Sequence, residues 1–112
     1  MLFRSRKADG GAGVRTPRFV PQDVADWARD PGALHGVDLV VANPPRTGLP
    51  RGVAEIIARG AASRVVLVSC DPATLARDLR PFLIEGYRLE RVEPVDLFPQ
   101  TAHIETVSVL AR

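Results

Sequence analysis

The sequence is poor in the residues that build disulfide or metal-bound cores. Among 112 residues it has one cysteine, Cys70, and two histidines, His35 and His103. A lone cysteine cannot form an internal disulfide, which is typical of a reducing compartment. These three residues also lack the spacing of a metal site. We therefore expect no metal cofactor and a cytoplasmic location.

Long apolar runs and a strong charge are also absent. No run approaches the roughly 20 apolar residues that a membrane-spanning helix needs. The basic residues Arg4, Arg6 and Lys7 are not followed by an apolar run of signal-peptide length. Fifteen basic against thirteen acidic residues leave a formal charge of +2, which is a weak argument for nucleic-acid binding. We expect no membrane partner and a single domain with a modest core.

The first 18 residues predict a flexible leader. Gly10, Gly11 and Gly13 stand among polar residues, and Pro17 follows. A Gly-rich loop binds phosphate when it connects a strand to a helix, but the segment 3–7 does not resemble a buried strand. We therefore divide the chain into a leader over 1–18 and a folded domain over 19–112.

From residue 19 onward, segments with strand and helix character alternate. Near-continuous apolar runs predict two buried strands, and apolar residues at helical spacing predict the intervening helices. The predicted elements are strands over 18–20, 37–42, 64–69, 87–95 and 104–110, and helices over 22–28, 53–58 and about 72–85. This order predicts an α/β fold with a mostly parallel sheet. The last strand, joined to its neighbour by a loop, should be antiparallel.

Two strand ends carry the candidate site. In open α/β sheets, ligands bind beyond the carboxyl ends of the strands. The tetrapeptide 43–46 (Asn-Pro-Pro-Arg) follows the strand 37–42, and Cys70 follows the strand 64–69. A thiol before a helix lies near the helix N-terminus, which favours thiolate; the alternative is a buried cysteine acting as a small hydrophobe. If these strands are neighbours, Asn43 and Cys70 share one rim.

Two further features leave a functional and a structural role open. Pro44 and Pro45 stiffen the backbone, so they either present carbonyls and the Asn43 amide to a planar ring or simply terminate the strand. Glu105, beside His103, stands early in an apolar strand. An inward-facing carboxylate there would suit a general base, whereas an outward-facing one would only meet solvent.

Three blocks, 41–48, 68–78 and 96–106, occur in an order with a known counterpart. They read Val-Ala-Asn-Pro-Pro-Arg-Thr-Gly, Val-Ser-Cys-Asp-Pro-Ala-Thr-Leu-Ala-Arg-Asp and Asp-Leu-Phe-Pro-Gln-Thr-Ala-His-Ile-Glu-Thr. Together they resemble the C-terminal part of the uracil-C5 RNA methyltransferase family, over about residues 19–112. The resemblance implies the C-terminal half of a Rossmann-like class I methyltransferase sheet.

The resemblance also implies a chemistry and its residues. The family methylates uridine in tRNA or rRNA, with S-adenosylmethionine as methyl donor and no metal. Cys70 matches the nucleophile that attacks uracil C6, and Glu105 matches the base that removes the C5 proton. Asn43 matches the position, usually Asp, that contacts the target base near the cofactor, with Pro44 and Arg46 on the substrate side. Asp71 departs from the commoner Asn beside the nucleophile, and its carboxylate would disfavour a thiolate.

The cofactor loop of the family has no match in this sequence. Family members carry a Gly-rich loop before this region, and often an RNA-binding β-barrel, and residues 1–18 supply neither. We therefore expect a truncated catalytic domain with RNA as partner, weak cofactor binding, and self-association through an open strand edge at 37–42. The alternative is a non-catalytic remnant that acts as an RNA-binding or interaction module. An amino-methylating enzyme built on Asn43 is disfavoured by Arg46, since such enzymes have an aromatic residue there.

Overall fold

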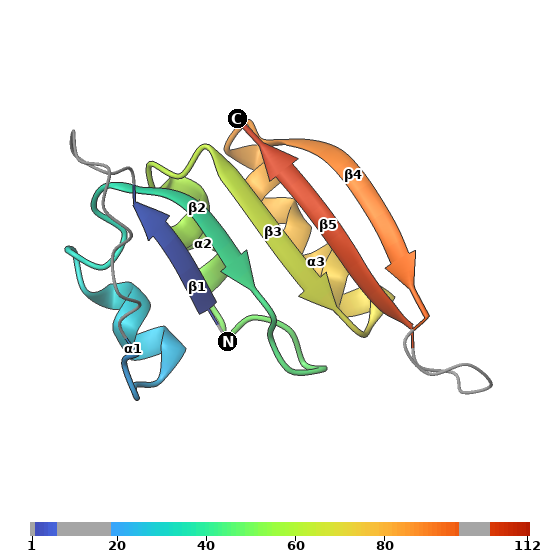
Figure 1. The fold of residues 1–112 in the computed structure, drawn as a ribbon, viewed down its shortest axis with the longest axis horizontal. Coiled ribbons are helices and arrows are strands. Elements are labelled where there is room, and N and C mark those ends of the chain that lie inside the picture. Colours follow the sequence, from blue (N-terminus) through green and yellow to red (C-terminus); the bar gives the residue numbers. More distant parts are fainter. Residues whose placement is uncertain (1, 7–18, 97–103) are drawn as a thin grey trace, which may run out of the picture.

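The computed structural model describes residues 2–6, 19–96 and 104–112, which form a single mixed sheet with helices packed on it (Figure 1). The elements in chain order are β1 (Leu2–Arg6), α1 (Val24–Arg29), β2 (Val37–Ala42), α2 (Val53–Arg59), β3 (Arg64–Ser69), α3 (Pro72–Ile84), β4 (Arg88–Val95) and β5 (Glu105–Ala111). No helix in these described ranges is long and apolar enough to cross a membrane.

The sheet has the strand order β1-β2-β3-β5-β4. β2 and β3 are parallel, because the helix α2 carries the chain back between them. β5 runs antiparallel to both β3 and β4, so β2, β3 and β4 share one direction. The expected α/β fold with an antiparallel last strand is confirmed.

The strand β1 corrects two expectations. Leu2–Arg6 pairs antiparallel with β2, from Leu2 opposite Ala42 to Arg6 opposite Val37. The predicted leader is therefore wrong for residues 2–6, while residue 1 and residues 7–18 lie outside the described part. The predicted open edge at 37–42 is also wrong, because β2 has a neighbour on both sides. An apolar strand with unpaired backbone groups is a template for any extended segment within reach.

The short strand predicted over 18–20 is not formed by its described residues. Phe19 and Val20 are outside any strand, and Phe19 is 90 % exposed. The remaining predicted elements agree with the structure to within a few residues, and β2 and β3 agree at both ends.

The core lies between one face of the sheet and the helices α2 and α3, which lie behind the sheet in Figure 1. Alternate strand residues point into this layer, as the two-residue period of a strand requires. The fully buried side chains include Val40, Ile57, Val65, Leu67, Phe82 and Leu110. On the opposite face, the apolar residues of β2, β3 and β5 are only half-buried: Leu39, Val41, Val66, Val68, Val107 and Val109.

Tyr87 fastens the end of α3 to the rest of the core. Its hydroxyl donates to the Ala62 carbonyl, and its ring meets the Phe82 ring edge-on at 5.5 Å between centroids. The Arg112 guanidinium lies 4.4 Å above the Tyr87 ring. Burial raises the pKa of the Tyr87 phenol, and the Arg112 charge partly opposes that rise.

Candidate active site

One rim of the sheet collects the three residues that the sequence singled out. Ala42 pairs with Leu67 in the parallel ladder, so the next residue, Asn43, lies beside β3 near its end. Ser69 pairs with Thr106 in the antiparallel ladder. Continuing that register by one position places Cys70 opposite Glu105. Because β2 and β3 are neighbours, the expectation that Asn43 and Cys70 share a rim is met.

Exposure differs among these rim residues. Cys70 and Glu105 are half-buried, whereas Asn43 is exposed. Glu105 is the first residue of β5 and pairs with Val95. The carboxylate is therefore neither enclosed in the core nor fully in solvent. His103 falls outside the described residues.

The turn that carries Cys70 is fixed by its neighbours on both sides. The buried Ser69 hydroxyl donates to the Asp71 carbonyl at 3.1 Å and accepts from the Asp71 amide at 3.3 Å. Pro72 then begins α3, where its missing N–H costs no helical hydrogen bond. Cys70 therefore stands in a well-fixed turn between β3 and α3.

Asp71 caps the helix that follows Cys70. Its Oδ1 accepts from the Ala73 amide at 2.9 Å and from the Thr74 amide at 3.1 Å. These bonds, that from the Thr74 amide above all, hold the pKa of the Asp71 carboxyl below its usual value, although desolvation of the carboxylate opposes them. The Arg46 guanidinium lowers this pKa further.

The loop between β2 and α2 is tied to α3. The Thr74 hydroxyl donates to the Arg46 carbonyl at 3.1 Å. Arg77 donates to the Thr47 carbonyl at 2.7 Å and to the Leu49 carbonyl at 3.3 Å. The helix after Cys70 therefore fixes the loop that carries Asn43, Pro44 and Arg46. Sequence reasoning gave Thr74 and Arg77 no role, although both lie in the block 68–78.

The described residues provide one side of a site for S-adenosylmethionine. Among them, the family resemblance assigns only Asn43 to the cofactor. On the far side of β2, the neighbouring position is filled by β1, which runs antiparallel and starts at this rim with Leu2 opposite Ala42. A cofactor loop in a doubly wound sheet follows the carboxyl end of a parallel strand, and β1 has the opposite direction. By themselves, these residues do not fit the whole cofactor.

Comparisons with known proteins identify relatives of this chain. The family model of tRNA (uracil-5-)-methyltransferases matches residues 33–112. An RNA methyltransferase of Gloeobacter violaceus is 53% identical over 100 residues, covering 89% of this chain and 21% of that protein. The 23S rRNA (uracil(1939)-C(5))-methyltransferase RlmD of Enterobacter is 46% identical over 82 residues, covering 73% of this chain and 19% of that protein.

A solved structure shows the same relationship. The tRNA (uracil-54, C5)-methyltransferase of Pyrococcus abyssi, in complex with S-adenosyl-L-homocysteine, superposes with a TM-score of 0.60 at 37% identity. The match covers 68% of this chain and 19% of that protein. The fold is thus similar to that of an RNA methyltransferase. The chain belongs to the tRNA (uracil-5-)-methyltransferase family and spans about a fifth of the length of the relatives it matches.

Proposed function

We propose that this chain carries the nucleophile and the base of an RNA uracil-C5 methyltransferase. The observation that supports this most is the strand register, which sets Cys70 opposite Glu105 when the pairing of Ser69 with Thr106 is continued. Asn43, the residue assigned to the target base, directly follows the neighbouring strand β2 at the same rim. Three residues far apart in the sequence thus converge on one edge of the sheet.

In the proposed reaction, the Cys70 thiolate adds to uracil C6. The C5=C6 electron pair moves toward the C4 carbonyl oxygen as an enolate, and C5 becomes nucleophilic enough to take a methyl group from a sulfonium donor, whose S–CH3 bond would break to leave a neutral thioether. The Glu105 carboxylate then removes the C5 proton. The electrons of the C5–H bond restore the C5=C6 bond, and Cys70 leaves as thiolate.

The loop 43–46 would hold the substrate. The Asn43 amide can accept a hydrogen bond from uracil N3–H and donate one elsewhere, which an aspartate could not do. Pro44 fixes the backbone at this corner. The exposed Arg46 guanidinium is suited to a phosphate of the RNA backbone.

S-adenosylmethionine, the methyl donor of the family, would supply an electrophilic methyl group, and Asn43 is the described residue that would contact it. The Enterobacter relative is an rRNA enzyme and the Pyrococcus relative a tRNA enzyme. We accordingly propose tRNA or rRNA as the substrate class. The second candidate is a non-catalytic module that binds RNA or a protein partner, favoured by β1, which occupies the edge of β2 in a direction that does not suit a cofactor loop.

Trapping with 5-fluorouridine separates these two functions. The protein is incubated with RNA that contains 5-fluorouridine and with S-adenosylmethionine, and the adduct is measured by mass spectrometry. We expect a covalent adduct that disappears in Cys70→Ala. Glu105→Gln should still form it, because a C5–F bond leaves no proton to remove. No adduct, even after adding the N-terminal part of a relative, would favour the non-catalytic module.

A further inference from the structure

The contacts between α3 and the loop after β2 point to residues with a role beyond the catalytic pair. We propose that Arg77 and Asp78 are positioning residues: they hold the loop 43–49 against α3, so that Asn43 and Arg46 stay in place relative to Cys70. This inference rests on the proposed function and adds to it the groups that align the two halves of the site.

Asp78 is a buried carboxylate with both oxygens in use. It is 6 % exposed, its Oδ2 accepts from the Leu49 amide at 2.8 Å, and its Oδ1 accepts from Arg77 at 3.1 Å. Burying a carboxylate is costly unless it is paired and hydrogen-bonded. An apolar residue would fill the same space on α3 without that cost. The carboxylate is therefore best explained by the loop amide that it binds.

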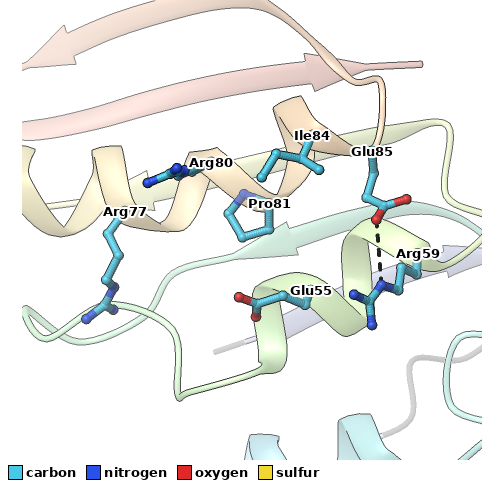
Figure 2. Close-up of a pocket in the computed structure, with 7 residues that line it drawn as sticks. All are labelled: Glu55, Arg59, Arg77, Arg80, Pro81, Ile84 and Glu85. Atoms are coloured by element: carbon cyan, nitrogen blue, oxygen red, sulfur yellow. Dashed lines mark ion pairs between the residues drawn. The ribbon is translucent and has the colours of Figure 1, made fainter.

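Arg77 also connects α3 to the loop, as a donor to loop carbonyls where Asp78 is an acceptor from a loop amide. Its Nη2 bonds the Thr47 and Leu49 carbonyls and also Asp78, so one guanidinium spans the loop backbone and the helix. Figure 2 shows Arg77 reaching from α3 toward this loop, whereas Arg80 stays beside its own helix. Both arginines line the same hollow between α2 and α3, which makes Arg80 a matched control.

Gly48 shows how closely the loop approaches this pair. Its backbone has φ +83°, and a Cβ placed there would lie 2.4 Å from the Arg77 Nη2 and 2.6 Å from the Asp78 Oδ2. Only a glycine leaves room for the loop backbone at this distance. The loop position is thus set by direct contact with the two charged groups.

The same helix begins at the Cys70 corner, since Asp71 is its cap. The side chains of α3 are therefore fixed relative to Cys70. Arg77 and Asp78 connect this helix to the substrate loop 43–49. In enzymes, a misplacement of about 1 Å from a distant mutation can slow a reaction about a hundredfold. Loosening this connection should therefore slow attack by Cys70 while the protein stays folded.

The test compares Arg77→Met with Arg80→Met. Both substitutions remove one charge from the exposed side of α3 and keep most of the side-chain length. At a temperature where both variants are folded, we expect adduct formation with 5-fluorouridine RNA to be at least tenfold slower in Arg77→Met and within twofold of the original rate in Arg80→Met. Arg77→Lys keeps the charge but not the fork of donors, so it should recover part of the rate. If Arg77→Met does not fold, Arg77→Lys replaces it in the comparison with Arg80→Met.

Hydrogen exchange of the Leu49 amide supplies a readout that does not depend on RNA. We expect it to be at least tenfold faster in Arg77→Met than in Arg80→Met. If the unsubstituted chain forms the adduct and the two Met variants react alike, the positioning role is overturned and the proposed function stands. If the chain forms no adduct even after the N-terminal part of a relative is added, the proposed function is lost. Unchanged exchange of the Leu49 amide in Arg77→Met would overturn the positioning of the loop, whether or not an adduct forms.

Discussion

Asp71 stands between the candidate nucleophile and the first turn of α3, and this position gives it two opposing effects. Its carboxylate stabilises the helix by accepting from the Ala73 and Thr74 amides. Those amides carry the positive end of the helix dipole, and the Asp71 carboxylate occupies that position. Asp71 thus caps the helix and at the same time places a negative charge beside Cys70 in the chain.

Asp71→Asn should separate these effects. Asparagine caps a helix about as well as aspartate, so the melting temperature at pH 7 should change little. The negative charge beside Cys70 is removed, so alkylation of Cys70 by iodoacetamide should be faster. Asp71→Ala provides the control, because it removes charge and cap together and should lower the melting temperature. Equal alkylation rates in the Asn variant and the unsubstituted protein would contradict the argument.

The pH dependence of stability should change in the same variant. The folded pKa of Asp71 is below its usual value of 3.8. A carboxyl group whose pKa is lowered by folding stabilises the folded state at pH values above its unfolded pKa. This contribution is lost as the pH falls from 3.8 through the folded pKa. Thermal melts below pH 3.8 should therefore show a smaller loss of stability in Asp71→Asn than in the unsubstituted protein. Parallel curves would indicate that the carboxylate is not held as described.

Ionisation of Tyr87 should make the stability of the fold decrease at high pH, opposite to the effect of Asp71. Its folded pKa is raised above the usual 10.0, so its contribution is complete below pH 10.0 and is lost as the pH rises through the folded value. Tyr87→Phe removes the bond to the Ala62 carbonyl and should cost about 1 kcal/mol at pH 7. Above pH 10.0 the variant should lose stability less steeply than the unsubstituted protein in urea titrations. An identical slope would show that ionisation of Tyr87 is not coupled to folding.

At the scale of elements, local sequence determined β2 and β3 and left β1 unforeseen. The strands 37–42 and 64–69 are apolar runs that stop at Pro44 and Pro72, so both their type and their ends are encoded locally. The segment 2–6 has no such pattern, and it is a strand because β2 offers it an edge. Pairing of this kind depends on residues about 35 positions away, and no local pattern reports it.

The candidate site likewise contains residues that the local sequence indicates and residues that it does not. Cys70, Asn43 and Glu105 could be found because each stands at the end of a predictable strand or in a recognisable block. Arg77 and Asp78 act on residues about 30 positions earlier, and an Arg-Asp pair on an amphipathic helix normally indicates only a solvated face. Their contacts with the loop depend on how α3 packs against it, which the helical pattern does not encode.

Gly48 and Gly52 allow the contact between loop and helix to be measured. Both have nearly the same left-handed backbone, with φ +83° and +85°, but a Cβ at Gly52 would meet nothing within 4 Å. Either alanine substitution should cost about 1–3 kcal/mol in backbone strain. Gly48→Ala should cost more, because it also displaces Arg77 or Asp78. Equal free energies of unfolding in the two variants would mean that the loop is not in close contact with α3.

At the scale of the whole molecule, the direction of β1 bears on cofactor binding. The edge of β2 is filled by a strand that starts at the rim and does not end there. Of the described rim residues, Asn43 alone was assigned to S-adenosylmethionine. We therefore expect calorimetric titration of the chain with S-adenosylmethionine to give weak binding or none. Micromolar binding by the monomeric protein would contradict this, and a parallel titration with Asn43→Ala would show whether Asn43 contributes.

The sheet as a whole should also depend on β1 to remain monomeric. Deleting residues 1–18 would leave the backbone groups of Val37–Ala42 unpaired along one edge. Because an open apolar edge pairs readily with another chain, the shortened protein should dimerise in sedimentation experiments, whereas the full chain should not. Leu39→Lys in the shortened protein is the control, since a lysine on an edge strand disfavours such pairing and should restore the monomer. A shortened protein that stays monomeric without the lysine would show that β1 does not protect this edge.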